Sequence, residues 1–418
     1  MAQSWIGRAR FLFIPLVVNG VAGWDQPPAN YREFVRSRVF FDPDQATGED
    51  RSLASYINAV SYGRASLDAA VSTPVTLTSL SSGDNPTSLA INKQPDAHRY
   101  EYISVVYPPN RVGAGGGMAQ PGQFQFSPAR TPNVTKARSR FLHDDPIGTW
   151  AMEVLHNVTT IGDYYNGVNH PGRFDEMADA EATHPSSYTK LEAGWLDRAA
   201  VPLHADGTRT TYVLHAVSLP QPPPAGRVAG VRVQAPGSQR YLVIEARLRT
   251  DRWERGFAGL LGIPSEGVVI YEFSPQTNSW PKLNPTGPWP PLELRTPTAL
   301  TVGQRYVHPA TGTRVSVTAA TAGGFAVEVA SSNVAVPSVE GFSKAAAEAA
   351  IRAAGLRPLA TGATGAQAWV WRQFPAAGTR VANGSVVRFQ LRVGAPPGKP
   401  DRGDDPPRGR PDRGDDRL

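Results

Sequence analysis

The five residues from Met152 to His156 read M-E-V-L-H and bring a carboxylate and an imidazole close together in the sequence. In the zinc-binding pattern H-E-x-x-H, two imidazoles four residues apart hold the metal, and the glutamate acts on the metal-bound water. Positions 152 and 156 share that spacing, so a helix places them one turn apart on one face. Glu153 therefore has the place of a general base, His156 that of a metal ligand, and Met152 that of a lost ligand.

The thioether of Met152 weakens any metal site at this position, because zinc prefers imidazole, thiolate or carboxylate ligands. Asp163 is the candidate third ligand, but it lies one residue farther from His156 than an H-x-x-G-x-x-D spacing requires. A structural zinc site is worth about 10–16 kcal/mol in total, so the loss of one of three protein ligands is expected to leave the site largely empty. The sequence therefore predicts no bound cofactor.

Two interpretations of Glu153 and His156 stay open. They can be a solvated surface residue and a hydrogen-bonded structural histidine, neither of which binds metal. Alternatively, a neighbouring side chain replaces the missing imidazole and zinc is bound after all. The residues that could do so are His143, His170, His184, Asp163, Asp175 and Asp179.

The helix that carries this segment is predicted from Asp145 to Val158. A start at Asp144-Asp145-Pro146 is followed by apolar residues at helical spacing, which form one stripe. The stripe consists of Ile147, Trp150, Ala151, Val154, Leu155 and Val158. Met152, Glu153 and His156 fall off this stripe, so we expect them to face away from the core.

The rest of residues 1–220 mixes helical and strand patterns, which predicts an α+β fold of mixed α/β type. Helices are expected at 29–38 and 51–60, and strands at 10–18 and 100–107. The apolar run within residues 1–23 is either part of an export signal or a buried first strand. Pro15 interrupts the run and no A-x-A cleavage pattern follows it, so the strand is favoured and the export signal is not clear.

Several segments around the helix, taken in order, resemble the secreted metallopeptidases related to immune inhibitor A. Upstream of it stand Ser52-Leu53 with Tyr56, and Ser61-Tyr62-Gly63-Arg64. Downstream stand Asp163-Tyr164-Tyr165, Phe174-Asp175-Glu176-Met177 and the run from Lys190 to Asp197, K-L-E-A-G-W-L-D. The resemblance covers residues 8 to about 330 and implies a metallopeptidase-like domain at 1–220. It also implies that Glu153 is the general base, that His156 and Asp163 are zinc ligands, and that Met177 lies in a Met-containing turn.

A β-rich domain is expected at residues 226–332, after a Q-P-P-P-A segment at 221–225 that neither continues a helix nor donates to a central strand. The predicted strands are 241–248, 267–273, 314–319 and 325–330. After residue 393 the chain contains few residue types other than Pro, Gly, Asp and Arg, so residues 394–418 are expected to be a disordered tail.

Residues 335–393 resemble a PASTA repeat. The order of V-P-S-V-E-G-F from Val336, a helix from Ser343 to Ala354, Q-F-P-A-A-G-T from Gln373 and N-G-S-V-V from Asn383 accounts for nearly the whole segment. Gly355 is expected to end the helix. The resemblance implies a small ββαβ module of the kind found in peptidoglycan-associated and cell-envelope proteins, although a spacer that binds nothing is equally compatible.

Composition excludes several classes of protein. The chain has no cysteine, so disulfides, thiolate metal sites and thiol nucleophiles are absent. Its formal net charge of +6 is not concentrated in a basic run, which argues against a nucleic-acid partner. No apolar run reaches the roughly 18 residues of a membrane span.

These observations lead to three hypotheses. The first is a non-catalytic or severely impaired metallopeptidase homologue that acts as an envelope-associated or protein-binding scaffold, outside the cell or in its envelope. The second is an active zinc endopeptidase in which Glu153 is the base and a substitute ligand joins His156. The third is a peptidoglycan-binding protein that acts through residues 335–393.

Overall fold

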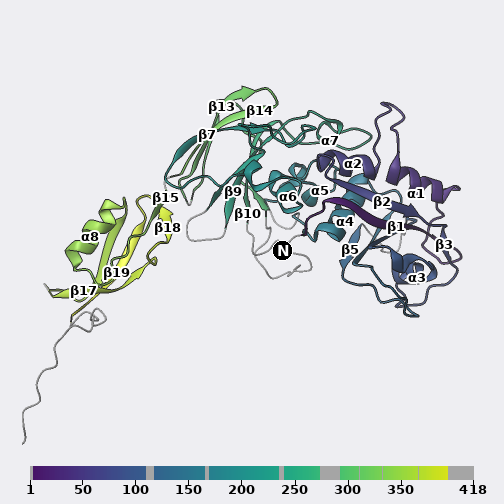
Figure 1. The fold of residues 1–418 in the computed structure, drawn as a ribbon, viewed down its shortest axis with the longest axis horizontal. Helices are drawn as coiled ribbons and strands as arrows, with labels where there is room; N and C mark the ends of the chain where they lie inside the picture. Colours follow the sequence, from purple (N-terminus) through teal and green to yellow (C-terminus); the bar gives the residue numbers. More distant parts are fainter. Residues whose placement is uncertain are drawn as a thin grey trace, which may run out of the picture. The chain divides into compact units, whose positions relative to one another are not determined.

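A computed structural model describes residues 3–109, 117–164, 169–234, 240–273, 292–309, 311–331, 333–365 and 367–393. The chain divides into two compact units, residues 1–332 and 333–418, which we describe separately (Figure 1). The predicted disordered tail, 394–418, lies outside the described residues. Within the described part of the chain, no helix is long and apolar enough to cross a lipid bilayer.

The first unit is built on a largely parallel sheet in the order β2-β1-β4-β6-β5, with β3 also paired to β1. Only β5, at the edge, is antiparallel to its neighbour. The strands are β1 (Gly7–Val18), β2 (Ala65–Val71), β3 (Val75–Leu77), β4 (Tyr102–Tyr107), β5 (Met118–Pro121) and β6 (Ala137–Leu142). The prediction of a buried first strand is confirmed, because β1 lies inside this sheet with most of its residues buried.

Helices cover both faces of this sheet, as the apolar residues on both faces of its central strands require. Phe11 and Phe13 of β1 point to one face, where they pack in a cluster with α1 (Tyr31–Phe40), α2 (Leu53–Val60) and α4 (Ile147–Thr159). Leu12 and Ile14 point to the opposite face and pack with α3 (Pro86–Lys93).

Two antiparallel sheets complete the first unit and pack face to face. One has the order β11-β10-β9-β8 and the other β12-β13-β14-β7. They share a core of aliphatic residues, among them Leu214, Ile244, Val315 and Val327. The strands are β7 (Arg209–His215), β8 (Gly230–Gln234), β9 (Tyr241–Arg247), β10 (Gly267–Phe273), β11 (Leu292–Leu294), β12 (Arg305–Val307), β13 (Arg314–Thr321) and β14 (Gly324–Ala330).

The domain boundary predicted at 221–225 does not separate compact units in the structure. Strand β7 precedes that segment but pairs along its whole length with β14, which follows it by about a hundred residues. Residues 1–220 and 226–332 therefore belong to one unit. The proline-rich segment is a largely exposed surface loop within that unit.

Short helices connect the parallel sheet to the two antiparallel sheets. They are α5 (Glu176–Asp179), α6 (Ser187–Glu192) and the 3-10 helices η2 (Gly172–Phe174) and η3 (Arg198–Ala200). Two further short helices lie elsewhere: η1 (Ala97–Arg99) between α3 and β4, and α7 (Arg252–Arg255) between β9 and β10. Strand β9 faces the connecting helices with alternate residues, because successive side chains of a strand point to opposite sides. Leu242 and Ile244 face the core between the two antiparallel sheets, whereas Glu245 and Arg247 are buried on the other side.

Arg247 is fully buried and binds four groups on this side of β9. Its guanidinium donates to both carboxylate oxygens of Glu254 and to Glu245 Oε1 at 3.1 Å. It also donates to the backbone oxygens of Phe174, at 2.6 Å, and His184, at 2.9 Å. Because both carboxylates are themselves fully buried, one cation holds β9, α7 and the connecting segment together.

Lys190 of α6 is a second basic side chain that is fully buried. Its Nζ is 2.8 Å from the oxygen of Val217 and 2.9 Å from His184 Nδ1, and it lies 4.2 Å from the centre of the Tyr62 ring. His184 Nε2 is 2.8 Å from the Asp251 carboxylate, which assigns the ring proton to Nε2 and leaves Nδ1 to accept from Lys190. Burial, followed by the charge of Arg247, lowers the pKa of Lys190 to about 7.

The second unit contains β15 (Asn333–Ala335), α8 (Lys344–Ala353), β16 (Arg357–Gly362), β17 (Ala368–Phe374), β18 (Arg380–Ala382) and β19 (Val386–Val393). The observed order is therefore β-α-β-β-β-β, not the expected ββαβ. Strand β19 pairs in parallel with β16 and antiparallel with β17. As predicted, Gly355 follows the helix in the left-handed region, at φ +75°, where a Cβ would also run into Asn383.

Replacing Arg247 by Met should destabilise the protein by about 3–5 kcal/mol, because Glu245 and Glu254 would stay buried without their cation. Urea unfolding followed by circular dichroism measures the loss. The triple variant Glu245→Gln, Arg247→Met, Glu254→Gln should recover part of it, and Arg314→Met, at an exposed site of β13, should change the free energy of unfolding by less than about 0.5 kcal/mol. A single variant as stable as the wild type would contradict this role of Arg247.

Lys190 should make the stability of the protein rise with pH above 7. The folded state loses this proton near pH 7 and the unfolded chain near pH 10.4, so between these values the unfolded state binds more protons and rising pH favours folding. Relative to Lys190→Met, the wild type should gain on the order of a few kcal/mol across this window in urea unfolding. The exposed control Lys93→Met should keep the rise; an equal rise in Lys190→Met would rule out this cause.

Candidate functional site

The residues of the M-E-V-L-H segment lie in α4, which is buried on all sides. Met152, Glu153 and His156 are 5%, 6% and 2% exposed, so the expectation that they face away from the core is wrong. Edge strand β5 and Gly117, which directly precedes it, cover this side of the helix. The approach is so close that a Cβ on Gly117 would overlap the Glu153 side chain.

Both ring nitrogens of His156 are engaged by acceptors. Nδ1 is 2.6 Å from the backbone oxygen of Ile161, and Nε2 is 2.8 Å from Asp163 Oδ1. Burial alone lowers the pKa of His156, but the hydrogen bond and charge of Asp163 outweigh it and raise the pKa to about 9. His156 is therefore an imidazolium that donates from both nitrogens. A metal ligand needs a deprotonated nitrogen with a free lone pair.

Glu153 has the opposite character, because one of its carboxylate oxygens is buried without any hydrogen-bond partner among the described residues. Burial raises the pKa of Glu153 to about 7, against the smaller opposing effect of His156. A buried carboxyl group in this environment is ready to hold or release a proton near neutral pH.

The other predicted site residues gather near His156. The backbone N–H of Tyr164, next to Asp163, donates to the oxygen of Met177 at 2.7 Å, and Met177 is fully buried. Asp175 caps α5 by accepting from Met177 N at 2.9 Å. Tyr165 lies outside the described residues. The structure thus brings Asp163 and the Met-containing segment to one side of α4.

The residues present do not fit zinc in this arrangement. Among the residues that the structure describes, no three His, Cys, Asp or Glu side chains are placed to share a metal ion. Of the six substitute ligands considered, Asp163 contacts His156, and Asp175, His184 and His143 have partners elsewhere. Asp175 accepts from Ser186 N and Thr189 Oγ1, His184 pairs with Asp251, and His143 packs edge-on against Phe34.

The flanking segments of the metallopeptidase resemblance form internal supports. Tyr56 donates to the oxygen of Thr183 at 2.7 Å and Tyr62 to that of Val217 at 3.0 Å. Arg64 pairs with Asp197 at 3.3 Å. The indole of Trp195 is fully buried and donates to the oxygen of Trp5 at 2.9 Å. These side chains join α2, α6 and the start of β1, and so have structural roles apart from any chemistry at α4.

The second unit offers a different kind of surface. Two hollows of about 130 and 410 Å³ share Lys344 and Gly365, beside the first turn of α8. The buried side chain of Gln373 connects β17 to the segment before α8. Its amide oxygen accepts from Val339 N at 2.8 Å, and its amide nitrogen donates to the oxygen of Pro337 at 3.0 Å. Lys344 lies between the two hollows, and its Nζ is 3.9 Å from the carboxylate of Glu348, which lines the larger one.

Two kinds of comparison relate this chain to known proteins: similarity to individual relatives, and a match to the model of a domain family. Two curated relatives, each described as a "Probable transcriptional regulatory protein", come from Mycobacterium ulcerans (strain Agy99) and Mycobacterium marinum (strain ATCC BAA-535 / M). Each is 27% identical over 100 residues, which is 24% of this chain and 40% of the relative, so the chain spans less than half of their length. The family model of the PASTA domain matches residues 334–392, and this part of the chain is a PASTA domain.

Proposed function

We propose that this protein is a non-catalytic component of the cell envelope, in which the PASTA domain binds peptidoglycan and the first unit serves as a scaffold that contacts other molecules. The observation that carries the proposal is the PASTA match, which covers nearly all described residues of the second unit. PASTA domains occur in cell-envelope proteins, and the proposal places this chain in the envelope or outside the cell.

The charge of the PASTA domain supports peptidoglycan as the ligand. Residues 334–393 contain seven basic and two acidic side chains, a net charge of +5. The stem peptides of peptidoglycan end in carboxylates, so a positive domain attracts them through long-range electrostatics. Lys344, between the two hollows, is the residue best placed to meet such a carboxylate.

The environment of α4 supports the non-catalytic part of the proposal. Met152 supplies a thioether where a zinc ligand is needed, and His156 keeps both nitrogens protonated against Ile161 O and Asp163. A metal would have to displace a buried ion pair to reach that ring, and the energy of breaking such a pair opposes it. The metallopeptidase resemblance then describes the ancestry of the fold and not its present chemistry.

Peptidoglycan binding should depend on the second unit. Full-length protein should sediment with purified peptidoglycan, and a chain ending at Ser332 should stay in the supernatant, because the proposed binding domain is gone. Lys344→Glu should lower the retained fraction several-fold by reversing a charge beside the hollows. Lys93→Glu makes the same charge reversal in the first unit and should bind like the wild type. Equal retention of the full and truncated chains would reject this role.

A second candidate function, an active zinc endopeptidase, is favoured by one observation. Glu153 is a buried carboxyl group with a pKa raised to about 7 by its burial, which suits a general base. That chemistry needs a metal-bound water close to Glu153. Zinc would have to compete with Asp163 for His156, so the candidate requires a rearrangement of this pair.

Metal analysis and a casein assay separate the two candidates. If the protein is non-catalytic, purified protein dialysed against zinc should hold far less than one equivalent, and its casein hydrolysis should equal that of Glu153→Gln and of a buffer blank. Stoichiometric zinc, together with hydrolysis that a chelator and Glu153→Gln both abolish, would overturn the non-catalytic proposal. Asp163→Asn is a useful further variant, because it frees His156 from its charged partner.

A further inference from the structure

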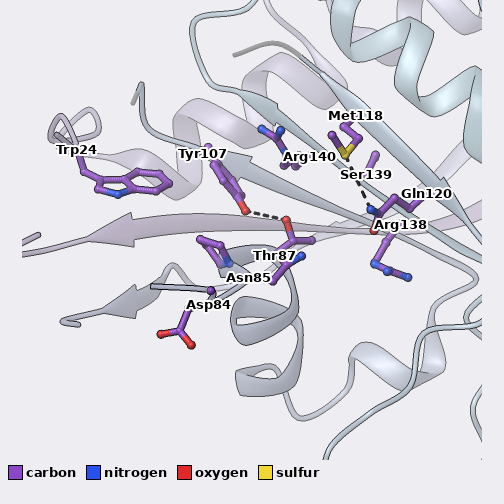
Figure 2. Close-up of a pocket in the computed structure, with 12 residues that line it drawn as sticks. Trp24, Asp84, Asn85, Thr87, Tyr107, Met118, Gln120, Arg138, Ser139 and Arg140 are labelled. Carbon is purple, nitrogen blue, oxygen red and sulfur yellow. Dashed lines mark hydrogen bonds between the residues drawn. The ribbon is translucent and has the colours of Figure 1, made fainter. Parts of the chain in front are cut away.

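A pocket of about 400 Å³ lies at the start of α3, on the face of the parallel sheet against which α3 packs (Figure 2). Residues from the start of α3, the end of β4, the edge strand β5 and its neighbour β6 line it. Its volume lies in the range of small-molecule sites. The lining includes Arg138 and Arg140, which point to this face because they alternate along β6 with the buried residues Ser139 and Phe141.

Neither arginine has a hydrogen bond or an ion pair among the described residues. Arg138 Nε and Arg140 Nη1 are shielded from water and lack any partner. Arg138 stacks over Phe124, with 5.3 Å from its guanidinium carbon to the ring centre, and Arg140 stacks over Tyr107 at 5.7 Å. The rings hold the two cations in place without neutralising them. A partly shielded guanidinium with no acceptor is costly, and a bound anion would remove that cost.

The acidic groups near the pocket do not pair with these arginines. Asp84 accepts from Ser81 N at 2.7 Å, and Figure 2 shows its carboxylate directed away from Arg138 and Arg140. Burial raises the pKa of Asp145 and Glu153, and Arg140 opposes this rise without an ion pair to either group. The pocket therefore presents two positive charges to whatever enters it.

Neutral donors stand beside the two cations. Thr87 Oγ1 and the Tyr107 hydroxyl are 2.7 Å apart, and both line the pocket (Figure 2). Only one of these two hydroxyl protons is used in the bond between them, so the other can reach a ligand. Trp24, 5.5 Å from Tyr107 between ring centres, adds an aromatic surface to the same pocket.

We propose that this pocket binds the phosphate group of a small, sugar-sized phosphate ester. Two guanidinium groups match a dianion better than a monocarboxylate, and guanidinium groups form paired hydrogen bonds with phosphate oxygens. The pocket is larger than one phosphate ion, and Trp24 and Tyr107 supply apolar surface for the organic part. This inference stands apart from the PASTA domain and from the chemistry of α4.

Isothermal titration calorimetry on the full-length protein tests the proposal with three probes: inorganic phosphate, glucose 6-phosphate and glucose. We expect one equivalent of glucose 6-phosphate to bind, inorganic phosphate to bind more weakly at the same site, and glucose not to bind. Arg138→Gln and Arg140→Gln should each weaken glucose 6-phosphate binding at least ten-fold. Arg10→Gln, which removes an exposed arginine stacked on Tyr100, should leave binding unchanged.

Two further variants keep the test decisive if an arginine substitution disturbs folding. Arg140→Lys keeps the charge and loses the paired geometry, so it should fall between the wild type and Arg140→Gln. Thr87→Val changes no charge and should weaken glucose 6-phosphate binding several-fold. Saturable binding of neither phosphate probe would overturn the proposal. So would wild-type affinity in the folded arginine and threonine variants, and binding of inorganic phosphate alone would exclude an ester as the ligand.

Discussion

The burial of the Arg247 charge is the constraint on which the first unit depends. A cation inside a protein must be matched by acceptors, or its desolvation outweighs any packing gain. Two carboxylates and two backbone oxygens meet this need, and they come from β9, α7 and the segment around Phe174 and His184. The match is possible only when these elements meet, so the ionic contact fixes how the antiparallel sheets join the helical layer. Lys190 meets the same requirement by giving up its charge near pH 7.

The same requirement explains why α4 differs from an accessible metal helix. Strand β5 and the residues after the helix enclose it, so His156 needs partners of its own and finds them in Ile161 O and Asp163. A carboxylate that would help to hold a metal instead stabilises an imidazolium. Glu153 is buried in the same place, and one of its oxygens has no hydrogen-bond partner among the described residues. Its pKa is therefore raised to about 7, so that a bound proton removes the buried negative charge. Because α4 is buried, the residues at the spacing of a zinc motif form something else: His156 pairs with Asp163, and Glu153 is a neighbouring carboxyl group with a raised pKa.

The sequence predicted the elements well where the signal is local. The predicted strand 267–273 agrees with β10 to the residue, because an apolar run between turn residues can be recognised from a few neighbouring residues. The PASTA domain was predictable for a similar reason, since its glycines and prolines mark its turns. Contacts between distant segments give no such local signal. They include the pairing of β7 with β14, the packing of β5 over Met152 and Glu153, and the ion pairs of Arg247. The one available hint was Glu245 and Arg247 on alternate positions of an otherwise apolar strand.

The unpaired guanidinium groups of Arg138 and Arg140 contrast with two fully buried basic side chains of the first unit, Arg247 and Lys190. Arg247 binds two carboxylates, and the neutral amine of Lys190 binds an oxygen and an imidazole. Arg138 and Arg140 are ordered by stacking yet have no acceptor, although Asp84 lines the same pocket and turns to Ser81 instead. Neutral side chains at these two positions could pack against Phe124 and Tyr107 equally well, without the cost of a shielded charge. Support of the fold alone therefore does not explain two arginines here. A pair of unpaired cations at one cavity is best explained by an anion that enters from outside the chain.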